Sequence, residues 1–401
     1  MMGVQGDELA FSVEARETGE RSGWGLVVIA RDGALRPVSL HDGAVVGRGL
    51  GNVIDLGDAS LNPQHAQFVV RADGAYVSDL DTSRGTRIDG ISVSMLGLAE
   101  GCVLRMGSTL ALFAERDLAT YAGGPTVVGG EMVVGTRQRS WVDGAIANVS
   151  GRKSMVIQGS PGVGKATLAR VAMRVAGGSV PVQVVDGATI DPEHLLRTYD
   201  TEGPMLWLVT HVDRLPRAAQ SDLVRAIRAT EGSMMIGTVV GALEDAHAEG
   251  RVGTTLMGLV ETRVLRVPDL EERREDIPAL ALEMLRRVGI RLTEGAEDVF
   301  ECVLRAGWPG GVRELGKQLA VAFDAGGTVE GAVGILCGTI ERAAAKEPMP
   351  LQVSDPDLAR ARLQKALALA SGTVAVAARE LRMSRQAFYR ELRRLDLEWS
   401  K

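Results

Sequence analysis

Cysteines are scarce in this sequence, and long apolar runs are absent from it. Its 401 residues include three cysteines, Cys102, Cys302 and Cys337, whose spacing matches no metal-binding motif. We therefore expect buried thiols in a reducing cytoplasm. No stretch reaches the roughly 20 consecutive apolar residues of a transmembrane helix, and the polar, acidic N-terminus lacks the apolar core of a signal peptide. The sequence thus predicts a cytoplasmic protein that makes no membrane contact.

Internal repeats and low-complexity segments are absent as well, which argues against a repeat architecture. A length of 401 residues exceeds that of one ordinary hydrophobic core, so we expect about two to four domains. Hydrophobic residues make up 45% and charged residues 24% of the chain, which is typical of a soluble globular protein.

The net charge of −6 is unevenly distributed along the chain. Residues 357–401 contain ten Lys or Arg and five Asp or Glu, a net charge of +5, whereas residues 1–356 carry −11. A basic C-terminal segment on an acidic body indicates a polyanionic partner for that segment, although a charged helical face can also be merely solvated.

Turn residues and apolar periodicity indicate that the chain is a multidomain protein. Residues 22–116 contain short strands separated by Gly, Asp and Asn, which predicts an all-β sandwich or barrel. A Gly-rich linker (120–132) follows, and residues 131–269 then alternate apolar strands with helices, as in a parallel α/β sheet. Residues 270–345 have a mostly helical pattern, and residues 357–401 are also predicted to be helical after a proline-containing linker.

The stretch "VIQGSPGVGKATLA" contains the pattern G-x-x-x-x-G-K between a predicted strand and a predicted helix. Its glycines allow backbone N–H groups to surround phosphate oxygens, and Lys165 and the helix dipole add positive charge. We expect it to bind ATP or ADP; the alternative is a Gly-rich turn without a ligand. Ala166 occupies the usual position of the magnesium-binding hydroxyl, so Mg²⁺ is only weakly supported. The candidate nucleotide-binding residues are Gly159, Ser160, Pro161, Gly162, Val163, Gly164, Lys165, Ala166 and Thr167.

Two later motifs, "LEERREDIP" (270–278) and "WPGGVREL" (308–315), resemble the AAA+ domain of bacterial sigma-54-dependent enhancer-binding activators. In that family the first motif begins the helical lid, and the second carries the sensor arginine. The resemblance implies an AAA+ α/β nucleotide-binding subdomain at 131–269 and an AAA+ helical lid at 270–345. It also makes Arg313 the residue that senses nucleotide, the alternative being a surface arginine on a helix.

The stretch "PMLWLVTHVDRLP" departs from that family where its catalytic acids should stand. The family's Asp-Glu pair, which holds magnesium and activates water, is replaced by Thr210 and His211. Threonine cannot supply the missing negative charge, whereas His211 remains a possible base. A shifted register would make Asp213 the metal ligand instead. With the acids missing, the resemblance provides no catalytic residue and no metal site.

Further family features are also absent from the chain. The two positions of the trans-acting arginines are occupied by Gly253 and Leu259, and a sensor asparagine is replaced by Val239. Nothing between Lys165 and Leu206 resembles the "GAFTGA" loop that contacts the sigma factor. We therefore predict a core that binds nucleotide without hydrolysing it and that lacks the loop for contact with sigma-54 polymerase.

Residues 22–116 resemble a forkhead-associated (FHA) domain through Gly47-Arg48, His65, Asp79-Leu80 and Gly85-Thr86. In that family an Arg, a Ser-Arg pair and an Asn hold a phosphothreonine peptide. Here Arg48 is kept, whereas Asn62, Pro63 and Arg84 take the other positions. The candidate phosphopeptide-binding residues are Arg48, Asn62 and Arg84, and His65 is expected to brace the loops. Phosphothreonine binding and a phosphate-independent contact with a protein partner both remain open.

The stretch "GTVAVAARELRMSRQAFYRELRRLDL" resembles the Fis-type helix-turn-helix at the end of these activators, and residues 357–401 would form this all-α DNA-binding domain. Ser384 is suited to cap the second helix, and Arg and Gln side chains suit base edges and phosphates of double-stranded DNA. The candidate DNA-binding residues are Ser384, Arg385, Gln386, Tyr389, Arg390 and Arg393. The alternative is a basic helical hairpin used only for dimerisation.

Together these features predict a transcriptional regulator with an FHA-like sandwich, a degenerate AAA+ core with a helical lid and a helix-turn-helix. We expect a dimer or a ring that binds DNA and receives input from a protein partner. Two alternatives remain, namely an active ATPase that remodels sigma-54 polymerase and a phosphopeptide-docking scaffold.

Overall fold

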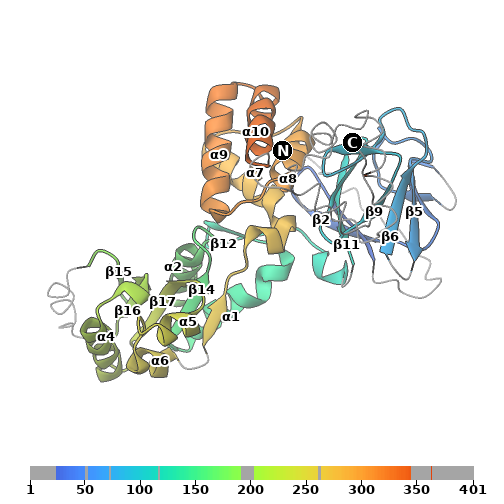
Figure 1. Ribbon diagram of the computed structural model, residues 1–401. Coiled ribbons are helices and arrows are strands. Elements are labelled where there is room, and N and C mark those ends of the chain that lie inside the picture. The colour runs from blue at the N-terminus through green and yellow to red at the C-terminus, as the bar shows by residue number, and fades with distance from the viewer. Residues whose placement is uncertain are drawn as a thin grey trace, which may run out of the picture.

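The computed structural model describes residues 24–49, 53–71, 74–115, 118–190, 203–260 and 263–344, together with Leu363. Within these residues the chain forms a β-sandwich, an α/β unit and a helical lid (Figure 1). The residues predicted to bind DNA lie outside the described part of the chain, so the helix-turn-helix stays a prediction. No described helix is both long enough and apolar enough to cross a lipid bilayer.

The sandwich consists of two sheets whose strands come from residues 25–114. The first sheet has the order β2 (Leu35–Ser39), β1 (Gly25–Ile29), β11 (Thr109–Ala114), β10 (Val103–Met106), β7 (Thr86–Ile88) and β8 (Ile91–Val93). The second has the order β4 (Val53–Asp55), β3 (Ala44–Gly47), β5 (Ala66–Arg71), β6 (Gly74–Asp79) and β9 (Met95–Leu98). Leu26, Phe68, Leu104 and Phe113 are buried in the hydrophobic core shared by the two sheets, which confirms the predicted sandwich.

The α/β unit contains a five-stranded parallel sheet, as predicted. Its order is β15 (Val182–Asp186), β16 (Leu206–Thr210), β17 (Met234–Val240), β14 (Met155–Gly159) and β18 (Val264–Arg266). The described helices of this unit are α1 (Arg139–Ser150), α2 (Lys165–Ala176), α4 (Arg217–Ala229), α5 (Leu243–Ala248) and α6 (Thr254–Val260). Leu208 and Trp207 of β16 belong to different hydrophobic cores, because this sheet is covered on both faces.

A connecting segment joins the sandwich to the α/β unit, and the lid follows the last strand of that unit. The connecting segment contains η1 (Leu118–Tyr121), β12 (Thr126–Val128), β13 (Met132–Val134) and η2 (Thr136–Gln138). The lid contains η4 (Leu270–Asp276), α7 (Ile277–Arg287), α8 (Ala296–Arg305), α9 (Gly311–Gly326) and α10 (Val329–Ala344). Asp269 begins η4 with a capping box that it forms with Glu272.

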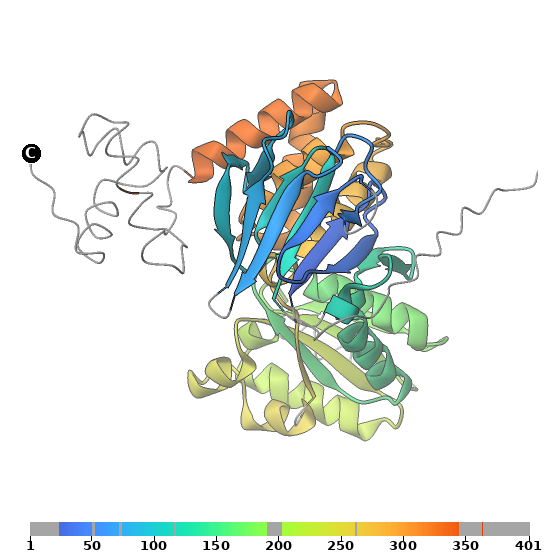
Figure 2. The same cartoon turned by 90° about the vertical axis from the view of Figure 1, so that its right-hand side faces the viewer.

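The outer face of the first sheet packs against the lid. Val27, Leu110 and Leu112 point away from the sandwich core and share one hydrophobic core with lid residues such as Leu280 and Phe300. Figure 2 shows the blue strands of the sandwich against the orange helices of the lid. All residues of β1 and β11 are consequently buried. The sandwich and the lid therefore form one continuous packed body.

Two of the three cysteines form a disulfide within the lid. Cys302 of α8 is bonded to Cys337 of α10, with their Cα atoms 5.6 Å apart. The expectation of unpaired thiols is therefore wrong for this pair. The two cysteines are 35 residues apart in the sequence, and only the packing of α8 against α10 brings them together. Cys102 is a buried free thiol as predicted, and burial raises its pKa.

Candidate functional site

The phosphate loop lies between β14 and α2, at the carboxyl edge of the parallel sheet, in the predicted strand–loop–helix context. Gly162 has a φ of +76° and Gly164, the residue before α2, a φ of +106°. Non-glycine residues rarely adopt such values, so these glycines allow the turn that directs backbone N–H groups inward. Val163 is buried beneath the loop, whereas Pro161 is exposed.

Lys165 stands at the first position of α2, with its ammonium group folded over the loop. Its Nζ donates hydrogen bonds to the carbonyl oxygens of Gly159 (2.8 Å) and Ser160 (2.7 Å). Burial lowers the pKa of Lys165, and the nearby carboxylate of Asp269 opposes that shift. The Ser160 hydroxyl donates to Asp269 at 3.1 Å. A phosphate group is a strong acceptor that would satisfy this partly buried cation.

The lid contacts the phosphate loop backbone to backbone. A β-carbon on Gly162 would lie 1.8 Å from the carbonyl oxygen of Gly310, just before α9. The amide of Arg313 donates to the carbonyl of Gly162 at 3.4 Å. The side chain of Arg313 is exposed, and its charge lowers the pKa of Lys165. The two cations are therefore close enough to repel each other. This places the predicted sensor arginine beside the phosphate loop.

A buried polar cluster, not predicted from the sequence, holds the other side of the loop. Arg273 is 3% exposed, and its Nη2 donates to the carbonyl of Val163 at 2.8 Å. Its Nη1 lies 3.7 Å from the carboxylate of Asp276, and its guanidinium lies over the ring of Trp141. Burial, aided by the neighbouring charge of Glu275, raises the pKa of Asp276 to about 7. The start of the lid is therefore attached to the phosphate loop through one buried arginine.

The end of β16 carries no carboxylate directed at the phosphate loop. Thr210 donates weakly to the carbonyl of Val185 at 3.4 Å, and His211 follows in a left-handed conformation with a φ of +52°. The Nδ1 atom of His211 lies 2.8 Å from Asp186 Oδ1. This pairing was not predicted, because Asp186 belongs to a different strand. Among the described residues, no group of three or more His, Cys, Asp or Glu could hold a metal ion.

Of the remaining positions named from the family pattern, only Asp213 carries a charged side chain. Asp213, which a shifted register would make a metal ligand, lies in η3 (Val212–Arg214) and forms an ion pair with Arg251. Val239 is fully buried. Gly253 donates its amide to Gln220, and Leu259 packs on the core. None of these positions presents a cation. The carboxylate of Asp213 is paired with Arg251, although its charge also acts on Lys165, where it opposes the lowering of the pKa.

The FHA loops bring together the residues predicted to bind a phosphopeptide. The amide of Arg48 donates to the carbonyl of Asn62 at 3.1 Å, and Gly47 lies against Pro63. Fully buried His65 accepts the amide of Asn62 at Nδ1 (3.3 Å), and its Nε2 lies 3.2 Å from the carbonyl of Gly85. His65 thus joins the Asn62 loop to the loop of Arg84, which matches its expected bracing role.

A carboxylate beneath these loops holds them in place through hydrogen bonds. Asp79 accepts hydrogen bonds from the hydroxyls of Thr82 (2.9 Å) and Thr86 (2.7 Å). Burial alone would raise the pKa of Asp79, but these hydrogen bonds lower it below its ordinary value. Arg48 and Arg84 are exposed, and no carboxylate among the described residues forms an ion pair with either. The loops therefore present two unpaired cations on a braced frame.

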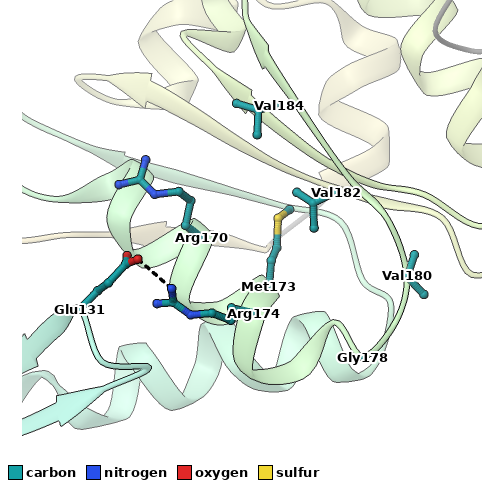
Figure 3. Close-up of a pocket in the computed structure, with 8 residues that line it drawn as sticks. All are labelled: Glu131, Arg170, Met173, Arg174, Gly178, Val180, Val182 and Val184. Atoms are coloured by element: carbon teal, nitrogen blue, oxygen red, sulfur yellow. Dashed lines mark hydrogen bonds and ion pairs between the residues drawn. The ribbon is translucent and has the colours of Figure 1, made fainter.

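The pocket in Figure 3 lies away from both of these sites. It has a volume of about 390 Å³ and is formed by α2, β15 and the connecting segment. Arg174 pairs with Glu131 at 2.7 Å across its rim, and Val182 and Val184 form an apolar wall. None of the predicted phosphate-loop residues lines it, so it provides no support for nucleotide binding.

One feature of the sequence indicates the contact between the sandwich and the lid, although the prediction of strands did not use it. The run "LALFA" in β11 is continuously apolar, whereas a strand with one solvated face alternates polar and apolar residues. Such a run is typical of a strand buried on both faces. The charged residues at this contact, including Arg105 and Glu301, gave no sequence signal because 196 residues separate them.

Comparisons with known proteins show similarity to one domain family and to several regulatory proteins. Residues 44–107 match the FHA domain model. Response regulator protein PilR of Pseudomonas aeruginosa is 34% identical over 153 residues, which cover 34% of this chain and 34% of PilR. Nitrogen assimilation regulatory protein NtrX of Azorhizobium caulinodans is 25% identical over 337 residues, covering 72% of this chain and 73% of NtrX. A solved structure of Brucella abortus NtrX in complex with ADP covers 66% of this chain and 70% of its own, at 21% identity and a TM-score of 0.44.

The matched segments span only about a third of PilR and 36% of the transcriptional regulatory protein XylR of Pseudomonas putida. The chain nevertheless contains an FHA domain and is related to sigma-54-dependent transcriptional regulators. The resemblance stated from the motifs is confirmed at this level.

Proposed function

We propose that this chain is a DNA-binding transcriptional regulator whose AAA+ core binds ATP or ADP without hydrolysing it, and whose FHA domain receives a protein signal. The observation that carries the proposal is the contrast within one sheet. The phosphate loop after β14 keeps its glycines and Lys165, whereas β16 ends in Thr210 and His211. Phosphoryl transfer to water needs a group that positions or deprotonates the water and a metal ion that neutralises charge.

Bound nucleotide would then act as a ligand that stabilises one arrangement of lid and core. Lys165 would exchange its two carbonyl partners for phosphate oxygens, and Arg313 would add a second cation from the lid. Magnesium would find a poor site here, because Ala166 lacks a hydroxyl and Thr210 carries no charge. Lid position, rather than turnover, would be the output of the nucleotide site.

The decisive experiment uses the purified full-length chain. ATP binding is measured by calorimetry, and phosphate release is followed on the same sample. We expect the wild type to bind ATP much more tightly than Lys165→Ala, with phosphate release no faster in the wild type than in that variant. Release that depends on Lys165 would overturn the proposal.

One geometric observation favours a second candidate, an ATPase with an unusual base. Asp186 holds His211 at 2.8 Å, and a carboxylate that orients an imidazole is the arrangement found in base-assisted hydrolysis. On this reading, His211→Asn and Asp186→Asn would both abolish release while leaving ATP affinity unchanged. Equal release in these variants and the wild type would exclude it.

DNA binding and protein input complete the proposal. The homology to transcriptional regulators and the basic segment 357–401 support the first, and exposed Arg48 and Arg84 support the second. Binding of the full-length chain to genomic DNA fragments, measured at moderate salt, tests the output. Affinity that equals that of the Arg385→Glu/Arg390→Glu variant would contradict it.

A further inference from the structure

The sandwich and the lid are joined by charges as well as by the hydrophobic core. Glu301 of α8, 7% exposed, accepts from Arg87 Nη2 of β7 at 2.8 Å and from Arg105 Nη1 of β10 at 3.3 Å. Arg105 also reaches Asp298 of α8 at 3.1 Å. The guanidinium of Arg274 in η4 donates to the carbonyl of Gly101 at 3.1 Å. One buried carboxylate on the lid thus fixes two neighbouring strands of the FHA sheet.

From Arg105, hydrogen bonds continue to the FHA loops. Its Nε donates to the carbonyl of Gly107 at 2.8 Å, in the turn between β10 and β11. In that turn, the amide of Ser108 donates to Ser60 Oγ at 2.8 Å and to Asp58 Oδ2 at 3.0 Å. Ser60 lies two residues before Asn62, so the contact with the lid is connected to the predicted phosphopeptide loop.

The lid continues this connection to the phosphate loop on its other side. Arg273 and Arg274 are neighbours in η4 that bind different parts of the molecule. Arg274 holds Gly101 of the FHA domain, whereas Arg273 holds the carbonyl of Val163. The backbone of Gly310 forms a second contact between the lid and the phosphate loop, at Gly162. A shift of the lid therefore disturbs both loops, because packed interfaces adopt discrete arrangements rather than deforming freely.

We propose that the FHA loops and the phosphate loop are coupled sites, linked through the Arg105–Glu301 contact, the lid and Arg273. This inference rests on the proposed function for the identity of the nucleotide, but not for the coupling itself. By thermodynamic linkage, a ligand bound at one site then changes the affinity of the other site by the same factor as the second ligand changes the affinity of the first.

The test compares Glu301→Gln with Glu330→Gln in the full-length chain by hydrogen exchange without nucleotide. Glu330 is an exposed lid residue in the first turn of α10 that makes no ion pair among the described residues, so its variant is a matched control. We expect Glu301→Gln to raise amide exchange in residues 58–62 and 159–165 by about threefold or more, with no change in the control. Exchange that rises in only one of the two segments, or in neither, would overturn the proposal.

A second variant and a second measurement keep the test decisive. Arg87→Gln removes one bond to Glu301 from a side chain that is 39% exposed, and it should shift both segments in the same direction by a smaller factor. In the wild type, ATP should slow exchange in residues 58–62, and Glu301→Gln should remove that effect. If the wild type binds no ATP, the proposed function fails, whereas the comparison without nucleotide still decides the coupling.

Discussion

The two surfaces predicted to bind phosphate groups are built in different ways. The phosphate loop of the α/β unit depends on backbone N–H groups, a half-buried lysine and a lid that contacts it. The FHA loops depend on side-chain cations, Arg48 and Arg84, that project into solvent from a frame braced by His65. The first surface is enclosed by tertiary contacts, whereas the second is ordered by short-range hydrogen bonds and left open.

This difference predicts how each surface responds to change. Salt screens the charged contacts within an enclosed site only weakly. Adding or removing a single atom there has a large effect, because the closely packed neighbours have no space to move. Exposed cations are screened by salt, and each contributes modestly. A core site that holds its ligand and a surface site that exchanges ligands rapidly would suit a regulator with a constant nucleotide and a variable protein signal.

The largest effect is expected from Gly162→Ala. The added β-carbon would overlap the carbonyl oxygen of Gly310 in a backbone conformation with positive φ, so we expect a loss of about 3 kcal/mol in unfolding free energy. Gly144→Ala is the control, because Gly144 lies inside α1 with open space around it and should gain about 0.5–1 kcal/mol. Urea unfolding measures both, and equal shifts would refute the close approach of lid and loop.

Removing the loop cation should come next. Lys165→Ala is expected to weaken ATP binding about 100-fold, because phosphate oxygens lose a charge-assisted partner in a half-buried site. Arg170→Ala is the matched control, since Arg170 lies on the same helix but is exposed. Calorimetry gives both affinities, and similar losses in the two variants would show that Lys165 only adds general positive charge.

The buried carboxyl behind the loop makes stability depend on pH. The folded-state pKa of Asp276, about 7, exceeds its ordinary value of 3.8, so the stability of the wild type should fall as pH rises between these values and level off above 7. Asp276→Asn removes this dependence. Relative to the wild type, the variant should therefore gain about 2 kcal/mol between pH 5 and pH 8. Thermal unfolding at both pH values tests this, and a constant difference would mean that Asp276 is ionised throughout.

The smallest effects should come from the open surface. Arg48→Ala and Arg84→Ala are each expected to weaken capture of a phosphothreonine peptide library about tenfold. Both losses should shrink as salt is raised to about 0.5 M, because exposed ion pairs are screened. Unphosphorylated peptides provide the control. Equal capture of both libraries would favour a phosphate-independent protein contact.

Local signals predicted most of this architecture. The strand, the glycine spacing and Lys165 lie within eleven consecutive residues, and the residues braced by His65 lie on neighbouring loops of one sandwich. The missing carboxylates at Thr210 and His211 could likewise be recognised directly after one strand. In contrast, the Asp186–His211 pair and the Cys302–Cys337 disulfide join elements that only the packed sheet and lid bring together.

The sequence by itself determined the order of the domains, the phosphate loop and the loss of the acids beside it, because each is a pattern of neighbouring residues. Only the tertiary structure decided that the FHA sheet is buried on both faces, that Glu301 holds two of its strands, and that Arg273 attaches the lid to the phosphate loop. Those contacts link residues separated by more than 100 positions, and their partners are chosen by packing and burial rather than by any local pattern.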